Sequence, residues 1–284
     1  MMKRIGFIDY YLDEWHANQY PAMIEAHNRQ YGTDYCVQYA WAESDAVGEG
    51  KLSSAAWCER HGVTCCATIE ELCAKSDCVI VLAPSDPDKH LAYATRIFQC
   101  GKSPYIDKSF APDLATAQQI FALAKEHRVR FFSTSALRYA EELLPYRGSA
   151  RSISTTGGGS NFEEYIIHQI EMVVTCLGCG AVRVRRTEET VGERLEVVYA
   201  DGRSATMLFA PELPFAAIVN VARGGVVELP IKSAFFASLI GAILRFFETG
   251  EPPFDGAETL EVMRIRDAVL RARSVSGTWQ NISR

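Results

Sequence analysis

The chain has 284 residues, with 29 Lys or Arg and 35 Asp or Glu, and a formal net charge of -6. This length is enough for one large or two ordinary domains. The basic residues form no single run, which argues against a nucleic-acid partner. No apolar run approaches the roughly 20 residues that span a bilayer, and residues 1–9 lead into a strand without a signal-peptide pattern. We expect a cytoplasmic protein that binds neither nucleic acid nor membrane.

In the first half of the chain, short apolar segments alternate with helical patterns. The expected strands are 3–9, 34–42, 78–83, 104–107 and 130–135, and the expected helices are 15–30, 52–61, 68–76, 87–100 and 113–127. Asp86 is expected to cap one helix, with Pro87 at its first position and Gly101 just past its end. This alternation is typical of a mostly parallel sheet with helices on both faces.

The pattern changes after about residue 150. A glycine-rich turn at 156–160 leads into a helix at 162–177, and two helices close the chain. Between them, extended segments are expected at 181–190, 193–200, 203–210 and 215–222, and the closing helices at 232–249 and 257–275. The turns between the extended segments predict a mainly antiparallel sheet. We therefore predict a doubly wound α/β domain over residues 1–140 and an α+β domain for substrate and oligomerisation over 141–284.

Nine cysteines are scattered through the chain, mostly inside apolar segments. An odd number in a chain of this size indicates reduced core thiols. Cys176 and Cys179 have CxxC spacing, but no second CxxC completes a zinc site. We predict no metal.

The segment 105–109 places an acid and a lysine where a short apolar strand ends. Ligands of open α/β sheets bind outside the carboxyl ends of the strands, so Asp107 and Lys108 are expected to face a cleft. Lys108 is therefore the first candidate for chemistry. A solvated loop pair is the alternative interpretation.

Several motifs along the chain resemble those of the Gfo/Idh/MocA family of oxidoreductases. Residues 83–90 match its strand end with a Pro-containing loop and the NxxH helix, Cys100-Gly-Lys102 matches its AGKHV turn, and Asp107-Lys108-Ser109 resembles its EKP signature with the proline lost. The likeness continues through residues 136–139 and 246–254. It implies a Rossmann-like first domain and NAD(P)-dependent oxidation of a sugar, polyol or related hydroxyl compound.

The family's second catalytic element is a helix with Asp-x-x-x-His, and here Glu164 and His168 stand in the matching place. Four residues apart on a helix, the two side chains share a face. From periodicity alone, Glu164, His168, Glu171 and Thr175 would be the wet side of an amphipathic helix. The resemblance implies that His168 takes or relays the hydroxyl proton, oriented by Glu164, while Lys108 hydrogen-bonds the reacting oxygen and nicotinamide accepts the hydride.

The turn after the first strand departs from the family pattern. A dinucleotide site uses G-x-G-x-x-G there, so that the backbone can approach the pyrophosphate at a helix N-terminus. Here Asp9 and Tyr11 stand where glycines are expected, and two more carboxylates follow within five residues. Bulk and like charge oppose a pyrophosphate at such a turn.

Three interpretations of residues 9–16 stay open. Asp13 could be the helix N-cap, with His16 in the first turn. Asp9, Asp13 and His16 could bind a metal, although their spacing matches no standard motif. The aromatic residues Tyr10, Tyr11 and Trp15 could line a sugar pocket.

The resemblance also marks positions for the cofactor. They are Gly6, Ile8, Asp9, Tyr10, Tyr11, Glu43, Ala83, Pro84, His90 and Asp107. Glu43 is the nearest candidate for the ribose-binding acid after the second strand, or an ordinary loop residue. Two functions stay open: an NAD- or NADP-dependent dehydrogenase with a small-molecule substrate, for which we expect a carbohydrate, or a cofactor-free relative that acts as a carbohydrate-binding or regulatory protein.

Two extended segments in the second half of the chain bear on the association of subunits. Residues 207–210 and 215–219 are apolar runs that we expect on an outward sheet face. The family resemblance implies that such sheets pack between subunits. We therefore expect a homodimer or homotetramer.

Overall fold

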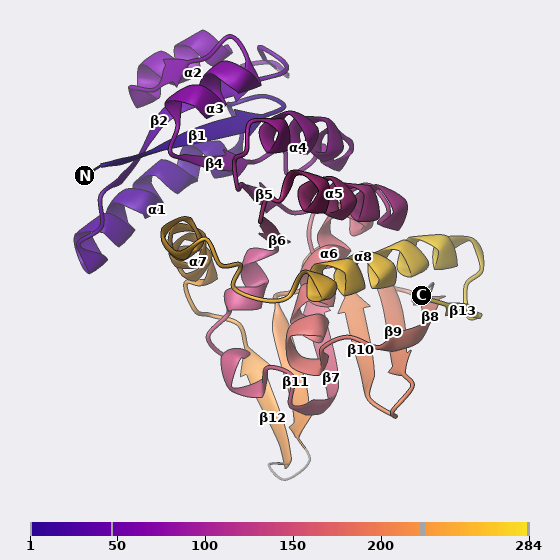
Figure 1. Cartoon of the computed structure of the whole chain (residues 1–284). Coiled ribbons are helices and arrows are strands. Elements are labelled where there is room, and N and C mark those ends of the chain that lie inside the picture. The colour runs from indigo at the N-terminus through magenta and orange to yellow at the C-terminus, as the bar shows by residue number, and fades with distance from the viewer. Residues whose placement is uncertain (1, 47, 222–224, 283–284) are drawn as a thin grey trace. The chain divides into compact units, whose positions relative to one another are not determined.

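The computed structural model describes residues 2–46, 48–221 and 225–282 (Figure 1). The chain forms two compact units. The first contains Met1–Ser133 and Leu239–Pro253, and the second contains Thr134–Ser238 and Phe254–Arg284. The first unit is thus formed by two separate segments of the chain. A single boundary at residue 140 does not include the second of them, Leu239–Pro253.

The first unit is built on a six-stranded sheet. Its strands are β1 (Lys3–Asp9), β2 (Tyr35–Ala42), β3 (Thr64–Cys65), β4 (Cys78–Val81), β5 (Tyr105–Asp107) and β6 (Phe132–Thr134), in the order β3-β2-β1-β4-β5-β6. β1 pairs in parallel with β2 and β4, and β4 with β5. The expected doubly wound sheet is confirmed. The carboxyl ends of β1, β4 and β5 therefore lie at one edge.

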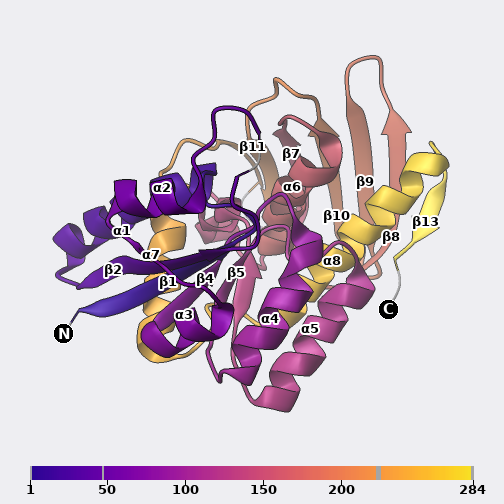
Figure 2. The ribbon, with the colours of Figure 1, turned by 90° about the horizontal axis from the view of Figure 1, so that it is seen from above.

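Helices cover both faces of this sheet (Figure 2). α1 (Trp15–Tyr31) and α2 (Ser54–His61) lie on one face, and α3 (Ile69–Lys75), α4 (His90–Gln99) and α5 (Leu114–His127) on the other. The Thr68 side chain caps α3, since its Oγ1 accepts from Glu71 N at 3.0 Å. Asp86 stands before η1 without a side-chain cap hydrogen bond. The helix expected from Pro87 begins instead as a 3-10 turn, η1 (Pro87–Lys89), and becomes α-helical at His90.

The second unit is built on a seven-stranded, mixed sheet. Its strands are β7 (Ala150–Gly157), β8 (Ala181–Glu188), β9 (Glu193–Tyr199), β10 (Ser204–Phe209), β11 (Ala216–Val221), β12 (Gly225–Pro230) and β13 (Trp279–Asn281), in the order β12-β11-β7-β10-β9-β8-β13. β10 and β7 run parallel, and the other pairs described here are antiparallel. The expectation of a mainly antiparallel sheet is confirmed.

Two helices, α6 (Phe162–Leu177) and α8 (Gly256–Arg271), cover one face of this sheet (Figure 1). α7 (Phe235–Thr249) links the units, because its residues from Leu239 on belong to the first. Short 3-10 turns complete the second unit: η2 (Ala136–Tyr139), η3 (Leu144–Tyr146) and η4 (Ala272–Ser274).

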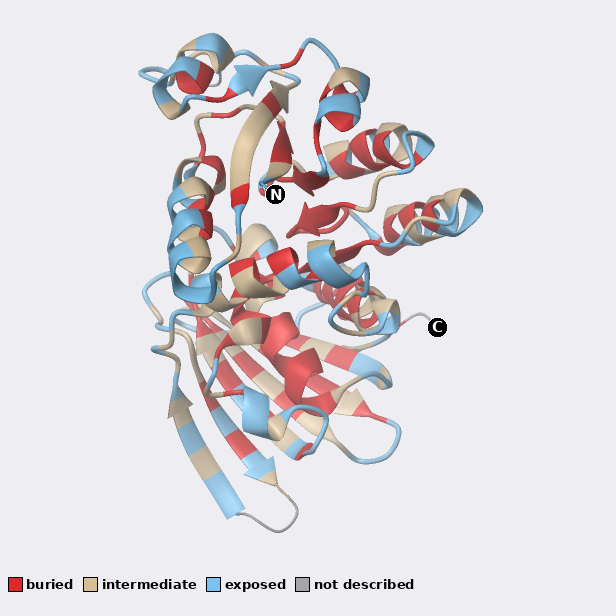
Figure 3. Cartoon of the chain, turned by 60° about the vertical axis from the view of Figure 1, so that its left-hand side comes forward, coloured by how far each residue is buried: buried red, intermediate tan, exposed pale blue. Residues whose placement is uncertain are grey.

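Burial alternates along the strands of the second unit (Figure 3). Met207, Phe209, Ala217 and Val219 are buried, and the Phe209 ring meets the Phe162 ring of α6. The expectation that these runs lie on an outward face is wrong for these residues, because every second side chain of a strand points to the helix layer. The homodimer or homotetramer stays a prediction.

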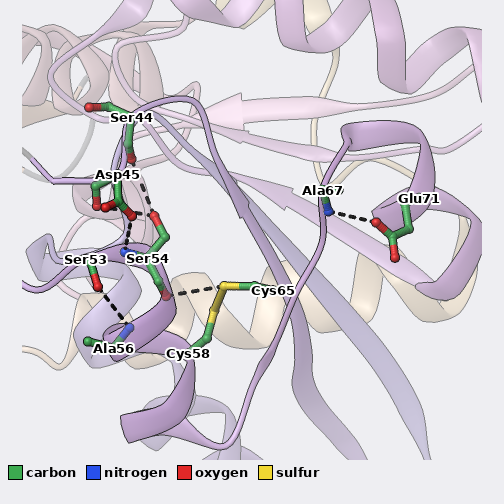
Figure 4. Close-up of a disulfide and its surroundings, with 9 residues drawn as sticks. All are labelled: Ser44, Asp45, Ser53, Ser54, Ala56, Cys58, Cys65, Ala67 and Glu71. Atoms are coloured by element: carbon green, nitrogen blue, oxygen red, sulfur yellow. Dashed lines mark hydrogen bonds between the residues drawn. A yellow bond between two sulfur atoms is a disulfide. The ribbon is translucent and has the colours of Figure 1, made fainter.

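A disulfide joins Cys58 in α2 to Cys65 in β3 (Figure 4). The expectation of reduced thiols is wrong for this pair, because the chain turns back after α2 and brings their Cα atoms to 6.0 Å. The remaining cysteines are free: Cys36, Cys66, Cys73, Cys78, Cys100, Cys176 and Cys179. Within the described residues, no helix is both long and apolar enough to cross a membrane.

Candidate functional site

The end of β5 holds the acid and lysine singled out by sequence. Asp107 is 2% exposed and Lys108 is 7% exposed, so the interpretation as a solvated loop pair is wrong. Tyr105 Oη donates to Asp107 Oδ1 at 2.8 Å. Lys108 Nζ donates to the carbonyl of Pro84, in the loop after β4, at 3.5 Å. Burying an ammonium group or a carboxylate is costly unless it has hydrogen-bond or ionic partners. Buried charged side chains of this kind are typical of functional sites.

Asp9 closes β1 and ties it to the loop after β4. Its Oδ1 accepts from Tyr10 N at 2.7 Å and from Ala83 N at 2.9 Å, and Ala83 adopts a left-handed backbone with φ 51°. Asp9 is 1% exposed, and its Oδ2 is buried without a hydrogen-bond partner. Burial, and then the neighbouring Glu14, raise the pKa of Asp9 well above its ordinary value.

The start of α1 is capped by Glu14, and the expectation that Asp13 is the N-cap is wrong. The Glu14 carboxylate accepts from His16 N at 2.8 Å and from Ala17 N at 2.5 Å. Asp13 turns elsewhere, because its Oδ1 accepts from Asn18 Nδ2 and its Oδ2 from Leu52 N. A longer side chain thus reaches the helix N-terminus from the position where a shorter one is usual.

His16 links two acids of the first unit. Its Nδ1 lies 3.0 Å from Glu14 Oε2, and its Nε2 lies 3.6 Å from Asp107 Oδ2. Burial lowers the pKa of His16, but Asp107 and Glu14 outweigh it, so the pKa is raised. Asp9, Glu14, His16 and Asp107 together are called the acidic cluster below.

The two other interpretations of this turn have different outcomes. Among the described residues, no group of three or more His, Cys, Asp or Glu side chains could hold a metal ion, and Asp13 points away to Asn18 and Leu52. Tyr10 and Tyr11 meet edge to face with ring centroids 6.2 Å apart, and Trp15 is 48% exposed. A sugar pocket lined by these rings stays a prediction.

Two further positions marked for the cofactor are engaged by the chain itself. Glu43, just after β2, accepts from Lys89 Nζ at 2.5 Å and from Tyr93 Oη at 2.9 Å, and Lys89 lowers the pKa of Glu43. His90 is fully buried, with its ring nitrogens 2.8 Å from the Leu82 carbonyl and 3.0 Å from that of Phe110. His90 thereby joins the loops after β4 and β5.

Gly6 and Ile8 lie inside β1, away from the turn. Ile8 is fully buried. A Cβ on Gly6 would lie 2.4 Å from Leu72 Cδ2 and 2.5 Å from Ser76 Oγ. Gly6 therefore allows β1 and α3 to pack closely. This packing role differs from the role of the glycines that let a phosphate approach the backbone.

In the second unit, a serine that sequence reasoning missed holds His168. Ser135 Oγ lies 2.6 Å from His168 Nδ1, and Leu137 N donates to the same Oγ at 3.3 Å. The contact fixes the ring of His168 through Nδ1, and the tautomer of the ring decides which of the two groups donates the hydrogen bond. A polar residue at the end of the expected strand 130–135 was the available signal.

Glu164 lies in the first turn of α6. Its Oε2 accepts from Asn161 Nδ2 at 3.1 Å, and Asn161 Oδ1 caps α6 by accepting from Glu164 N at 2.8 Å. A role for Glu164 in orienting His168 stays a prediction.

A buried charge network lies beside Ser135. Glu171 Oε1 accepts from Ser135 N at 3.1 Å, and its Oε2 accepts from Arg138 Nε at 2.7 Å. Arg138 Nη1 also donates to Glu258 at 2.5 Å. Glu171 is 2% exposed and Thr175 is 1% exposed, so placing them on the wet side of the helix is wrong, because η2 packs against that side. Burial raises the pKa of Glu171, and Arg138 opposes that rise.

Comparison with known proteins finds one matching family model. Residues 22–135 match the model of the Gfo/Idh/MocA family, described as an oxidoreductase family with an NAD-binding Rossmann fold. This segment of the chain is therefore similar to that family. It begins after the turn that carries Asp9 and Glu14.

One curated relative matches over a short segment. Across 57 residues the chain is 37% identical to the uncharacterized oxidoreductase YhhX of Escherichia coli (strain K12). That match covers 20% of this chain and 16% of YhhX.

Solved structures match over nearly the full length. The myo-inositol dehydrogenase from Lactobacillus casei, solved with NAD(H) and myo-inositol, superposes with a TM-score of 0.81 at 12% identity, covering 100% of this chain and 98% of that one. GenD2 from gentamicin A biosynthesis, solved with NAD, gives 0.77 at 13%, covering 100% and 98%. UDP-N-acetylglucosamine 3-dehydrogenase GnnA from Acidithiobacillus ferrooxidans gives 0.73 at 16%, covering 97% and 98%. At these identities the likeness establishes the fold.

The chain has the types of group that a dinucleotide would use. Backbone N–H groups at the start of α1 suit a pyrophosphate, and an acid after β2 suits a ribose hydroxyl. In the structure, Glu14 occupies the N–H groups of His16 and Ala17, and Lys89 and Tyr93 occupy Glu43. A dinucleotide would therefore compete with the chain's own side chains for these groups.

Proposed function

We propose that this chain is an NAD(P)-dependent oxidoreductase that acts on a hydroxyl group of a sugar, polyol or related compound. The observation that carries the proposal is the buried pair of Asp107 and Lys108 at the end of β5, where open α/β sheets bind their ligands. The bound nicotinamide would supply the hydride acceptor, since no side chain can. The match of residues 22–135 to the model of an NAD-binding oxidoreductase family supports the proposal.

Lys108 is assigned to the reacting oxygen. Its ammonium group has three N–H donors, and the carbonyl of Pro84 accepts one of them at the long distance of 3.5 Å. A donor held this way can hydrogen-bond a substrate hydroxyl and stabilise the negative charge that develops there. The carboxylate of Asp107, the residue before Lys108, is fixed by the Tyr105 hydroxyl.

His168 is assigned to the proton of the hydroxyl group. Ser135 fixes the orientation of its ring through the contact at Nδ1. In the oxidation direction the neutral ring takes the proton of the substrate hydroxyl group and becomes an imidazolium. In the reduction direction the imidazolium returns that proton to the new hydroxyl group.

The test replaces Lys108 with methionine, which keeps the length of the side chain and removes its donors. Turnover of a polyol and sugar panel that includes myo-inositol is followed with NAD and NADP. We expect the Lys108→Met variant to lose at least about 100-fold in kcat/KM. The matched control is Lys102→Met, because Lys102 belongs to the same unit and donates to the Ser76 carbonyl.

Equal turnover in Lys108→Met and wild type would reject the assignment, provided that the thermal unfolding of both proteins is alike. If the protein binds carbohydrate but shows no turnover with either NAD or NADP, the alternative is favoured. That alternative is a cofactor-free relative that acts as a carbohydrate-binding or regulatory protein.

A further inference from the structure

The first turn of α1 carries an anion that belongs to the chain itself. Glu14 is 6% exposed, and its carboxylate accepts the N–H groups of His16 and Ala17. The imidazole of His16 adds a third contact at 3.0 Å. A glutamate is unusual at an N-cap, where shorter polar side chains are preferred. The carboxylate is therefore fixed over the positive end of the helix.

The same N–H groups are the ones that a dinucleotide needs. In a dinucleotide-binding βαβ unit, the pyrophosphate lies at the N-terminus of the helix that follows the first strand. α1 is that helix, because it follows β1 and leads to β2. Two anions cannot share one pair of N–H donors, so a pyrophosphate and the Glu14 carboxylate exclude each other there.

Asp9 adds an independent observation on the same turn. It occupies a position where the dinucleotide pattern has glycine, its carboxylate is 1% exposed, and its Oδ2 has no hydrogen-bond partner. A side chain at this position obstructs the close approach of the backbone to a phosphate, whether or not the carboxyl group is ionised. The turn therefore opposes a pyrophosphate twice, once through the Glu14 carboxylate and once through the Asp9 side chain.

We propose that Glu14 is an internal ligand of the pyrophosphate site at the start of α1, and that a dinucleotide binds only by displacing its carboxylate. Glu14 then sets the affinity for NAD and NADP without contacting the reacting atoms. This inference rests on the proposed function for the identity of the ligand. The binding measurement below needs no turnover, so the two proposals can fail separately.

The test measures binding by calorimetry with NADH, NADPH and inorganic pyrophosphate as probes. Glu14→Ser removes the charge and the reach of the side chain while keeping a residue that caps helices well. Glu14→Gln removes the charge alone. The matched control is Glu25→Gln, which makes the same charge change on α1 at an exposed position that pairs with Arg29.

We expect Glu14→Ser to bind NADH and pyrophosphate at least about tenfold more tightly than wild type. The affinity of Glu14→Gln should lie between those of Glu14→Ser and wild type, and the affinity of Glu25→Gln should equal that of wild type. Helix content by circular dichroism checks that each variant folds. If Glu14→Ser does not fold, Glu14→Gln against Glu25→Gln decides. Unchanged or weaker NADH binding in the folded Glu14 variants overturns the proposal.

Discussion

The two units of this protein bury charged side chains in opposite ways. In the second unit, Arg138 is fully buried, and its guanidinium meets Glu171 and Glu258 and lies 4.0 Å from the centre of the Phe254 ring. In the acidic cluster of the first unit, the carboxylates of Glu14 and Asp107 share one imidazole, and Asp9 Oδ2 has no hydrogen-bond partner. In the first arrangement each carboxylate meets the guanidinium, whereas in the second one buried carboxylate oxygen, Asp9 Oδ2, has no hydrogen-bond partner.

This difference separates a structural role from a ligand-directed one. A matched buried network fixes neighbouring groups, and here it fixes Ser135 and through it His168. An unmatched cluster costs stability, which proteins accept mainly at functional sites. The variants below test this contrast, from the largest expected effect to the smallest.

The largest effect is expected from Arg138→Met. Removing the guanidinium leaves Glu171 buried without its ionic partner, which costs about 3–5 kcal/mol in comparable cases. The free energy of unfolding is measured in urea. The control is Arg194→Met, whose ion pair with Glu189 is 41% exposed on both sides and contributes at most about 1 kcal/mol. Similar losses in both variants would contradict the structural role of the matched network.

Ser135→Ala sharpens the link between that network and the chemistry. Without the hydroxyl, the ring of His168 loses the hydrogen bond at Nδ1, and we expect kcat to fall about tenfold with little change in KM. The readouts are the pH profile of kcat and the nitrogen chemical shifts of the His168 ring, which report its tautomer.

The conservative variant Ser135→Thr keeps a hydroxyl at the same position and should restore the tautomer and most of the rate. A wild-type tautomer in Ser135→Ala would show that Ser135 does not set it.

The smallest effect is expected from Asp9→Asn and depends on pH. The pKa of Asp9 is raised in the folded chain, by burial and then by Glu14, so the folded state keeps a proton that the unfolded state releases near its ordinary value of 3.8. Stability therefore falls as pH rises from that value through the folded pKa. Glu14 and Asp107 face the carboxylate and oppose its charge, and the nearby imidazole of His16 is unchanged by the substitution.

We expect Asp9→Asn to raise the free energy of unfolding by about 1 kcal/mol at neutral pH and to leave it unchanged below the ordinary pKa of Asp9. The control is Asp77→Asn, because the hydrogen bond from Arg4 lowers the pKa of Asp77 to about 2. That variant should lose stability at neutral pH, the opposite sign. A loss in Asp9→Asn would show that the ionised carboxylate is stabilising.

The sequence alone was sufficient for the layers of the fold and the first site residues. The alternation of apolar strands with capped helices predicted the parallel sheet, since periodicity and caps are local properties. The placement of Asp107 and Lys108 at a strand end was confirmed for the same reason. β7 was missed because its sequence, ARSISTTG, is rich in Ser and Thr and carries little apolar signal.

Only the tertiary structure decided which charged groups meet. Periodicity placed Glu171 on the wet side of α6, but Arg138, 33 residues earlier in the chain, packs against it. The partner of Asp9 is the N–H group of Ala83, 74 residues away. Cap preferences favoured Asp13, whereas the bonds from Asn18 and Leu52 turn it away and leave the helix start to Glu14. Such pairings depend on contacts distant in sequence, which local propensity and spacing do not encode.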